Sequence, residues 1–565
     1  MTAAHIDDKA MKMNFDYIVV GGGSGGCVLA ARLSEDADVS VALIEAGPAD
    51  KSVFIHCPAG LAVLAKTHAA NWNFSTVPQQ GLGGRVGWSP RGKVLGGSSS
   101  VNAMVYTRGH RADYDHWAEQ GNPGWSYDEV LPYFRRAEHN ERIRDEYHGN
   151  DGPLNVMDLR SPNRSMQEAF INAGREAGYR VTDDFNGAEQ EGIGPYQVTH
   201  KNGERFSAAK AYLTPNLDRK NLTIFTEAHT TRILFEGKRA TGIEFRQGGE
   251  LKQVGANREV LMAAGALQTP QLLMLSGVGD ARELGAMGIG IVHDLPGVGR
   301  NFHDHVDVVQ VVNAPTLAET FGVSFGGVAR IARAIGEWRR NRSGMLTTNF
   351  AEAGGFIKSQ SSEAIPDLQL HFVIAKLVDH GRTTVFGHGY SAHVCLLRPL
   401  SRGTVRLASR DPFAAPLIDP NFFADPDDMQ RMIRGFRVMR EILQQPALTK
   451  LGGHEHPRSA GARSDAEIEQ FVRAYADTIY HPVGTCRMGS GALDVVGPDL
   501  RIHGLEGIRV VDASIMPRIV GGNTNAPTIM VAEKASDMIK AARLSGSEPQ
   551  AAAQPKWPFK HPIAA

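Results

Sequence analysis

The residues with the clearest chemical meaning are glycines near the start of the chain. Gly21, Gly23 and Gly26 form the pattern G-x-G-x-x-G directly after a short apolar run. In such a turn the first glycine permits a sharp bend, the second lets a pyrophosphate approach the backbone, and the third lets a helix pack closely on a strand. The helix that follows would offer free N–H groups to the phosphates. An ordinary glycine turn is the alternative.

The elements around these glycines fit a nucleotide-binding unit. Residues 16–20 are typical of a strand, 27–33 of a helix, and 39–44 of a second strand that ends at Glu45. Such a βαβ unit places Glu45 where a carboxylate can accept hydrogen bonds from an adenosine ribose. The pattern predicts dinucleotide binding and leaves both FAD and NAD open. Glu45 as a solvated charge at a strand end is the alternative.

Length, charge and cysteine content narrow the class of protein. A chain of 565 residues predicts two or more domains. Lys and Arg number 60 against 61 Asp and Glu, so nucleic acid is not an expected partner. The four cysteines lack a CxxC pair, which indicates neither a disulfide framework nor a thiolate metal site. Without a signal peptide or a long apolar run, the chain is expected to be cytoplasmic, with peripheral attachment to the inner face of the cell membrane left open.

Two longer segments carry a family resemblance. Residues 91–106 and 265–279 resemble the two signature segments of the glucose–methanol–choline (GMC) oxidoreductase family, and the similarity continues through 481–489, 511–517 and 522–528. This resemblance implies one FAD per chain, held extended, with the flavin where two domains meet. Family members that link FAD covalently to a histidine have that histidine where this sequence has Val101. Non-covalent FAD is therefore expected.

The expected fold is α/β, or α+β overall, with two domains. A discontinuous Rossmann-like FAD-binding domain is expected from residues 13–156, 222–310 and 475–542. A substrate-binding domain, built on an antiparallel sheet with helices, is expected from 157–221 and 311–474. Runs of alternating apolar and polar residues at 367–373 and 403–407 favour antiparallel strands there. The Pro- and Ala-rich tail at 543–565 is expected to be loosely ordered.

The resemblance also implies which residues contact FAD. A Gly/Ser run would let backbone approach the flavin, and the helix over 528–539 would point its positive end at the ring. A buried Gly/Ser turn without a ligand is the alternative for that run. The expected cofactor-binding residues are Gly21, Gly23, Gly26, Glu45, Ala46, Gly96, Gly97, Ser98, Asn102, Ala103, Met104, Val105, Thr230, Asp512, Ala513, Pro527 and Thr528.

Oxidation of an alcohol needs the loss of the hydroxyl proton and the transfer of a hydride, and a neutral imidazole suits the first event near pH 7. In the family, the histidine at the position of His481 faces the flavin, so His481 is expected to be the base. The resemblance places Asn525 at the second catalytic position, where an amide can both donate and accept hydrogen bonds; a helix cap is the alternative. Cys486 is interpreted as a buried small residue. No metal is expected, although His303 and His305 lie close together in the sequence.

Within the family, this sequence looks most like bacterial alcohol dehydrogenases of alkane degradation, with polyethylene-glycol and choline dehydrogenases close by. The expected reaction is oxidation of a primary alcohol, aliphatic and of medium chain length, to the aldehyde, with hydride transfer to flavin N5. Quinone, oxygen or an electron-transfer protein would accept the electrons. Choline, aryl and furanic alcohols stay open, as does a flavin-containing lyase or photodecarboxylase. Residues 321–342 are apolar and basic, which fits either a helix on an anionic membrane or a cover over the active-site mouth.

Overall fold

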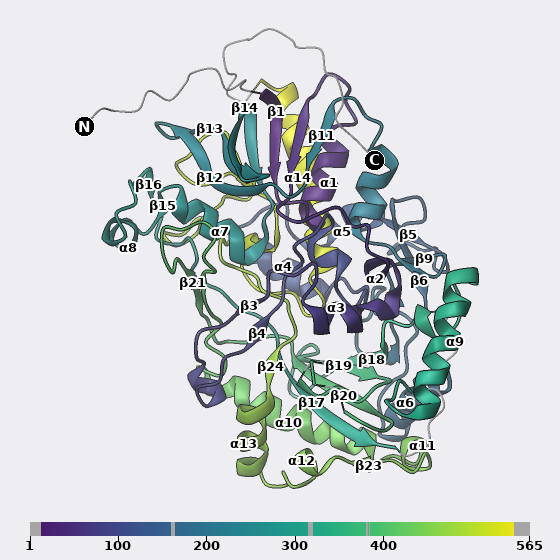
Figure 1. The fold of residues 1–565 in the computed structure, drawn as a ribbon. Coiled ribbons are helices and arrows are strands. Elements are labelled where there is room, and N and C mark those ends of the chain that lie inside the picture. The colour runs from purple at the N-terminus through teal and green to yellow at the C-terminus, as the bar shows by residue number, and fades with distance from the viewer. Residues whose placement is uncertain (1–12, 160–163, 315–319, 380–381, 384, 547–565) are drawn as a thin grey trace.

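The computed structural model describes residues 13–159, 164–314, 320–379, 382–383 and 385–546. Within these residues, two seven-stranded sheets lie one above the other in the view of Figure 1, with helices on their outer sides. The last helix, α14 (Asn525–Leu544), extends into the tail expected at 543–565, and residues 547–565 lie outside the described part of the chain.

The upper sheet is the predicted dinucleotide-binding unit. Its parallel part runs in the order β11-β2-β1-β14-β25, and β12, β13 and β14 form an antiparallel meander at its side. Because parallel strands cannot be joined by a tight turn, α1 (Ser24–Leu33) makes the crossover from β1 to β2. The strands are β1 (Met13–Val20), β2 (Val41–Ile44), β11 (Leu222–Phe225), β12 (His229–Glu236), β13 (Arg239–Gln247), β14 (Glu250–Met262) and β25 (Ile508–Val510). The Rossmann-like prediction is confirmed.

A buried carboxylate ties the helices beside this sheet together. The side chain of Glu533 on α14 is fully buried and pairs with Arg32 of α1 at 2.9 Å and Arg136 of α5 (Tyr127–Ala137) at 2.8 Å. The hydroxyl of Tyr212 also donates to it at 2.8 Å. A buried charge is tolerated only when it is paired in this way. The network therefore fixes α14, whose first turn lies at the functional site described below, against the nucleotide-binding unit.

The lower sheet is antiparallel, as predicted, in the order β23-β17-β20-β19-β18-β7, with β24 paired to β17. Its strands are β7 (Gly192–Pro195), β17 (Val306–Asn313), β18 (Ala351–Ile357), β19 (Leu368–Val373), β20 (Gly389–Leu396), β23 (His454–Glu455) and β24 (Asp477–Thr478). One face packs its apolar side chains, such as Leu370 and Phe372, against α10 (Pro426–Leu443) and α6 (Arg164–Glu176). Because successive strand residues point to opposite faces, Gln369 and His371 point away from that core.

The expected domain limits divide this lower sheet at two places. β17 begins at Val306, so the strand crosses the limit expected at residue 310. β24 pairs with β17 although residues from 475 onward were expected with the FAD-binding part. β17 starts directly after His305, without a turn that would mark a boundary in the sequence. The expected limit was misplaced because hydrophobicity alone does not reveal which sheet a strand joins.

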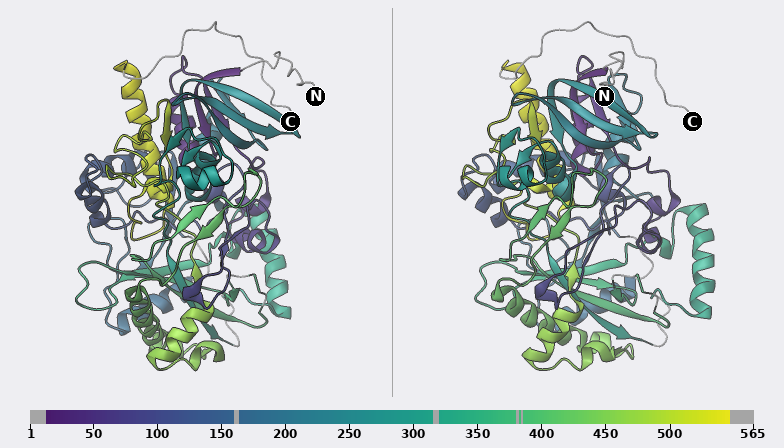
Figure 2. Two further views of the ribbon diagram at one scale, coloured as in Figure 1. Left: turned by 90° about the vertical axis from the view of Figure 1, so that its left-hand side faces the viewer. Right: turned by 60° about the vertical axis from the view of Figure 1, so that its left-hand side comes forward.

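Helix α9 (Phe325–Asn341) lies at the edge of the molecule. Figure 2 shows it standing outside both sheets, and only three of its residues, Gly327, Ala334 and Trp338, are buried. Across the described ranges, no helix combines the length and the apolar character needed to cross a membrane.

Candidate active site

A cavity of about 910 Å³ lies between the two sheets and takes its lining from both. This volume is in the range of sites for large organic ligands. The predicted site residues that line the cavity are Gly21, Gly23, Glu45, Ala46, Gly97, Ser98, Asn102, Ala103, Met104, Val105, Thr230, His481, Asp512, Ala513, Asn525 and Thr528. Gly26, Gly96 and Pro527 lie behind this lining, so only an indirect part in binding fits them. Residues spread over most of the sequence thus meet around one space.

The glycine turn has the geometry that a phosphate needs. Gly21 has φ +102°, and a Cβ there would lie 2.5 Å from the carbonyl oxygen of Ala263. A Cβ on Gly26 would lie 1.9 Å from the oxygen of Gly21, which explains how α1 packs so closely on β1. In contrast, the nearest atom to a Cβ on Gly23 is 4.0 Å away. α1 starts at Ser24 without a side-chain cap, so its first N–H groups are left for a ligand in the cavity.

Glu45 lies between the turn and the end of β2. Its Oε2 accepts the N–H of Gly22 at 2.9 Å and its Oε1 accepts the N–H of Gly47 at 2.7 Å. Burial raises the pKa of Glu45 to about 7, and the two backbone donors oppose that rise. Each carboxylate oxygen keeps capacity for a further donor. The side chain is therefore a buried cavity-wall acceptor and not a solvated charge.

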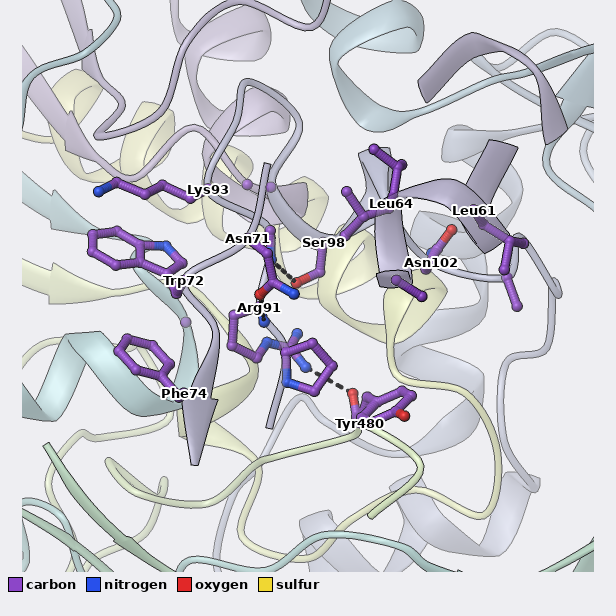
Figure 3. A pocket seen from close by; sticks show the side chains of 18 of the residues that line it. Leu61, Leu64, Asn71, Trp72, Phe74, Arg91, Lys93, Ser98, Asn102 and Tyr480 are labelled. Carbon is purple, nitrogen blue, oxygen red and sulfur yellow. Dashed lines mark hydrogen bonds between the residues drawn. The ribbon is translucent and has the colours of Figure 1, made fainter. Parts of the chain in front are cut away.

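An aromatic group forms another part of the wall, which the sequence analysis missed. Trp72 and Phe74 are stacked with ring centroids 5.7 Å apart, and Figure 3 shows both side chains with Lys93 beside them. The Lys93 ammonium lies 4.4 Å from the Trp72 ring centroid, and His229 meets the same ring edge-on at 5.4 Å. Flat aromatic walls of this kind accept a planar ring system. Together with the glycine turn, they fit an extended FAD.

The loop 96–105 crosses directly over the glycine turn. Gly97 has φ +54°, and a Cβ there would lie 2.7 Å from the Cα of Gly23. Further along, the Oδ1 of Asn102 accepts from Arg205 Nη1 at 2.9 Å and from the N–H of Met104 at 3.0 Å. Arg205 is fully buried and so fixes the Asn102 side chain in the cavity wall. Arg205 thus holds the loop on the side away from the cavity, so that the loop can form a rigid surface for a bound ring.

His481 follows β24 and points into the same cavity. Its backbone N–H donates to Asp304 at 2.7 Å. Its ring Nδ1 lies 3.0 Å from Nδ1 of His305, and its Nε2 lies 3.2 Å from Nδ2 of Asn523. Burial, together with the neighbouring His305, His371 and Arg91, lowers the pKa of His481 well below its ordinary value. The ring is therefore neutral at physiological pH, as a proton acceptor must be.

The amide beside His481 is Asn523, where the sequence analysis expected Asn525. Asn525 is the first residue of α14, and its Oδ1 accepts the hydroxyl of Ser24 at 2.7 Å. The helix thus begins before Pro527, the first residue expected for it. Both asparagines fall in one short loop-to-helix segment, and sequence spacing does not tell which amide faces the histidine. The carboxamide of Asn523 lies across from the imidazole, whereas that of Asn525 faces the glycine-turn helix.

The lower sheet adds polar side chains that the sequence analysis did not single out. His371 and His393 are opposite each other on β19 and β20 and both line the cavity. Nδ1 of His393 donates to Asp307 at 2.6 Å, since a carboxylate only accepts. The alternation noted at 367–373 was the available signal, because its polar residues had to face away from the apolar core.

Asp512 on the cavity wall and the segment 301–305 behind the wall hold the neighbouring backbone in place. Asp512 accepts from the N–H of Gly265 at 2.9 Å and from Thr269 Oγ1 at 2.6 Å, which holds the start of α7 (Gly265–Leu275) at the cavity. Nε2 of His303 accepts the N–H of Ile519 at 2.8 Å. Among the described residues, no group of His, Cys, Asp or Glu is arranged to hold a metal ion. Cys486 is buried, as predicted.

Comparison with known proteins agrees with this geometry. A family model described as GMC oxidoreductase matches residues 15–307, and its C-terminal counterpart matches residues 399–532. Over 528 residues the chain is 48% identical to an alcohol dehydrogenase [acceptor] of Pseudomonas putida, covering 93% of this chain and 95% of that protein. It is 44% identical to the mitochondrial choline dehydrogenase of Homo sapiens over 535 residues, covering 93% and 90% of the two chains.

A solved structure shares the whole architecture. It is a formate oxidase of Aspergillus oryzae RIB40, studied for the effect of a mutation on FAD modification. It superposes with a TM-score of 0.88 at 28% identity, covering 94% of this chain and 99% of that one. The fold, the cavity and the likeness over nearly the full length point to one class of enzyme.

Proposed function

The chain belongs to the GMC oxidoreductase family of FAD-dependent enzymes that act on CH–OH donors, and from this premise we propose that it oxidises a primary alcohol to the aldehyde with His481 as the base. The relative with 48% identity is an alcohol dehydrogenase, which supports an alcohol as the substrate, and within that class we propose an aliphatic alcohol of medium chain length. We propose the residues of the upper sheet for FAD binding and the face of the lower sheet for binding the alcohol.

Two side chains of the chain act on the hydroxyl group of the alcohol. Nε2 of His481 accepts the hydroxyl proton, and Nδ2 of Asn523 donates to the oxygen as negative charge develops on it. The two groups are 3.2 Å apart, so one substrate oxygen can reach both. FAD, when bound, supplies the acceptor for the hydride that leaves the carbinol carbon. His481 is buried and Asn523 is half-buried, which limits the access of water to the reacting oxygen.

One observation carries this proposal: a neutral, buried imidazole and a fixed amide meet on the wall of the cavity that the glycine turn opens into. The test is anaerobic addition of 1-hexanol, benzyl alcohol or choline, each to a separate sample of the yellow holoenzyme. Loss of the flavin absorbance with 1-hexanol is expected. Loss with choline or benzyl alcohol alone would reassign the substrate. Unchanged absorbance with all three would favour a lyase or a photodecarboxylase.

We further propose that a quinone accepts the electrons. The supporting feature is the apolar part of the lining, in which α3 (Leu61–Thr67) contributes Leu61 and Leu64, and the segment before and within α9 contributes Phe321 and Ile331. After anaerobic bleaching, a short-chain ubiquinone analogue should restore the yellow colour faster than air-saturated buffer does. Faster recovery in air would assign oxygen as the acceptor.

We also propose a peripheral contact with the membrane, and α9 supports it. Phe325 is 100% exposed and Val328 61%, and Ile335 lies on the same side of the helix. Phe386, 77% exposed, lies beside Val323 next to the start of α9. The exposed arginines 333, 339 and 340 of the same helix would attract anionic lipid headgroups.

Vesicle sedimentation tests this contact. Wild-type holoenzyme should pellet with vesicles containing phosphatidylglycerol more than with pure phosphatidylcholine. Phe325→Ser combined with Val328→Ser should weaken pelleting, whereas Val86→Ser with Leu251→Ser, at exposed sites in other parts of the chain, serves as the matched control. Equal pelleting of both double variants would rule out α9 as the contact.

A further inference from the structure

The ring of His481 has a second partner, which is fully buried, on its side away from Asn523. Its Nδ1 lies 3.0 Å from Nδ1 of His305, and the two rings cross at 88° with centroids 5.2 Å apart. Both histidines are buried, His305 completely. Two ring nitrogens at this distance share one hydrogen, so one of them donates and the other accepts. Which of them donates decides where His481 keeps its lone pair.

The carbonyl of Leu397 settles the direction. Nε2 of His305 lies 3.0 Å from this oxygen, and a carbonyl oxygen only accepts, so Nε2 carries the hydrogen. Burial lowers the pKa of His305 to about 3, so its ring holds a single proton at neutral pH. Nδ1 of His305 is therefore unprotonated and can only accept a hydrogen bond. It follows that Nδ1 of His481 carries a hydrogen and donates.

The opposite side of His481 gives the same answer independently. Oδ1 of Asn523 accepts from Thr107 Oγ1 at 3.1 Å and from Gln369 Nε2 at 3.1 Å. These donors orient the carboxamide so that its NH₂ group faces Nε2 of His481. An NH₂ group only donates, so Nε2 of His481 must offer a lone pair. Two sets of contacts, from different parts of the chain, thus require the same tautomer.

We propose that His305 is a positioning residue that, through the Leu397 carbonyl, holds His481 in the tautomer with Nδ1 protonated and Nε2 open to the alcohol. This inference rests on the proposed role of His481 as the base. When Nε2 takes the hydroxyl proton, the imidazolium keeps its Nδ1–H bond to His305, and no proton leaves His305. In the other tautomer, Nε2 would carry a hydrogen and could accept nothing.

Other groups near His481 do not serve this purpose. Arg91 and His371 act on the ring of His481 only through charge, which His371 carries only when protonated, and Asp304 binds the backbone N–H of His481. Within the part of the chain that the structure describes, His305 alone forms a hydrogen bond with the ring Nδ1 of His481. The tautomer therefore depends on one side chain, which makes it accessible to substitution.

Two substitutions separate positioning from bulk packing. In His305→Gln, the amide oxygen can accept from Nδ1 of His481 while the amide nitrogen donates to the Leu397 carbonyl. His305→Leu fills similar space and can do neither. We expect kcat of His305→Gln to stay within about fivefold of wild type and kcat of His305→Leu to fall by about 10²-fold, the lower end of what general base catalysis contributes. KM for the alcohol and the FAD absorbance should change little in either variant. Equal kcat for His305→Leu and wild type would overturn the inference.

A direct measurement does not depend on either variant folding. In wild-type holoenzyme labelled with ¹⁵N-histidine, the His481 signals can be assigned by their loss in His481→Ala. The ring should show a protonated Nδ1 and an unprotonated Nε2 at neutral pH, and the reverse pattern would refute the inference. Full turnover by His481→Ala would instead refute the proposed function, so the two failures are distinguishable.

Discussion

At the scale of single residues, the site depends on how burial and hydrogen bonds treat one imidazole. His481 is 9% exposed and lies next to other groups that become cations when protonated, so its charged form is disfavoured. Asp304 accepts a hydrogen bond from the backbone N–H of His481 and so fixes the chain at that position. A base that is already neutral and already oriented has little left to reorganise when the alcohol arrives.

The pH dependence follows from the direction of this shift. The base must be unprotonated to act, and the pKa of His481 is lowered well below its ordinary value of about 6.5. Activity should therefore be lost only as the pH falls through that lowered pKa. A plot of kcat/KM against pH should be level from pH 8 down to at least pH 6.5. An acid limb with its midpoint at or above pH 6.5 would speak against His481 as the neutral base.

The two neighbouring asparagines give a matched pair of variants. Asn523→Ala removes the donor next to the reacting oxygen and should lower kcat by about 10²-fold, as loss of one such donor does elsewhere. Asn525→Ala removes the bond to Ser24 and should weaken FAD binding, with a smaller change in kcat when FAD is saturating. A larger loss of kcat in Asn525→Ala would restore the assignment made from sequence.

The sequence predicted the residue types of the site better than their contacts. The glycines were found because the chemistry of their motif is local, and His481 was found because the segment around it resembles the family's. The contacts of Asn523, His305 and Gln369 were not predicted, because they join segments far apart in the chain. No local pattern distinguishes an amide that faces an imidazole from one that faces a helix.

At the scale of elements, the loop from Gly97 and the turn at Gly23 must touch for the cavity to have its shape. Gly97→Ala adds a Cβ 2.7 Å from the Cα of Gly23 at φ +54°. Gly237→Ala, at φ +58° in an open turn, carries the same backbone strain of about 1–2 kcal/mol without the clash. The FAD-to-protein absorbance ratio after purification should fall in Gly97→Ala only. Equal ratios in the two variants would show that this contact does not shape the cofactor site.

Strands and helices were predictable where their hydrophobic period was strong. The first strand, the crossover helix and the alternating strand at 368–373 were all expected close to their observed limits. The limits between the domains were less predictable, since the apolar pattern of β17 continues across the limit expected at residue 310, although the whole strand belongs to the lower sheet. Pairing of a strand is decided by its neighbours in space, which the local sequence does not contain.

At the scale of the whole molecule, FAD should lie between two parts and bind without a covalent bond. Val101 lines the cavity at the position where a linking histidine would be needed. Acid precipitation should leave a colourless pellet and a yellow supernatant. A yellow pellet would show a covalent link to some other residue.

Because FAD held in this way binds only the folded chain, its removal should lower the thermal midpoint of unfolding. Adding FAD back at 100 times its Kd should restore about 2.7 kcal/mol of the free energy of unfolding. Thermal unfolding of the apoprotein, measured with and without added FAD, gives this difference. No shift on adding FAD would mean that the two parts do not depend on the cofactor to stay together.

The most direct test of the central claim is rapid anaerobic mixing of His481→Ala holoenzyme with the alcohol that bleaches the wild type. The rate of loss of flavin absorbance should fall by about 10²- to 10⁴-fold, because the proton acceptor is gone, while the initial FAD absorbance stays that of the wild type. Bleaching at the wild-type rate would contradict the account, since the hydroxyl proton would then have another acceptor.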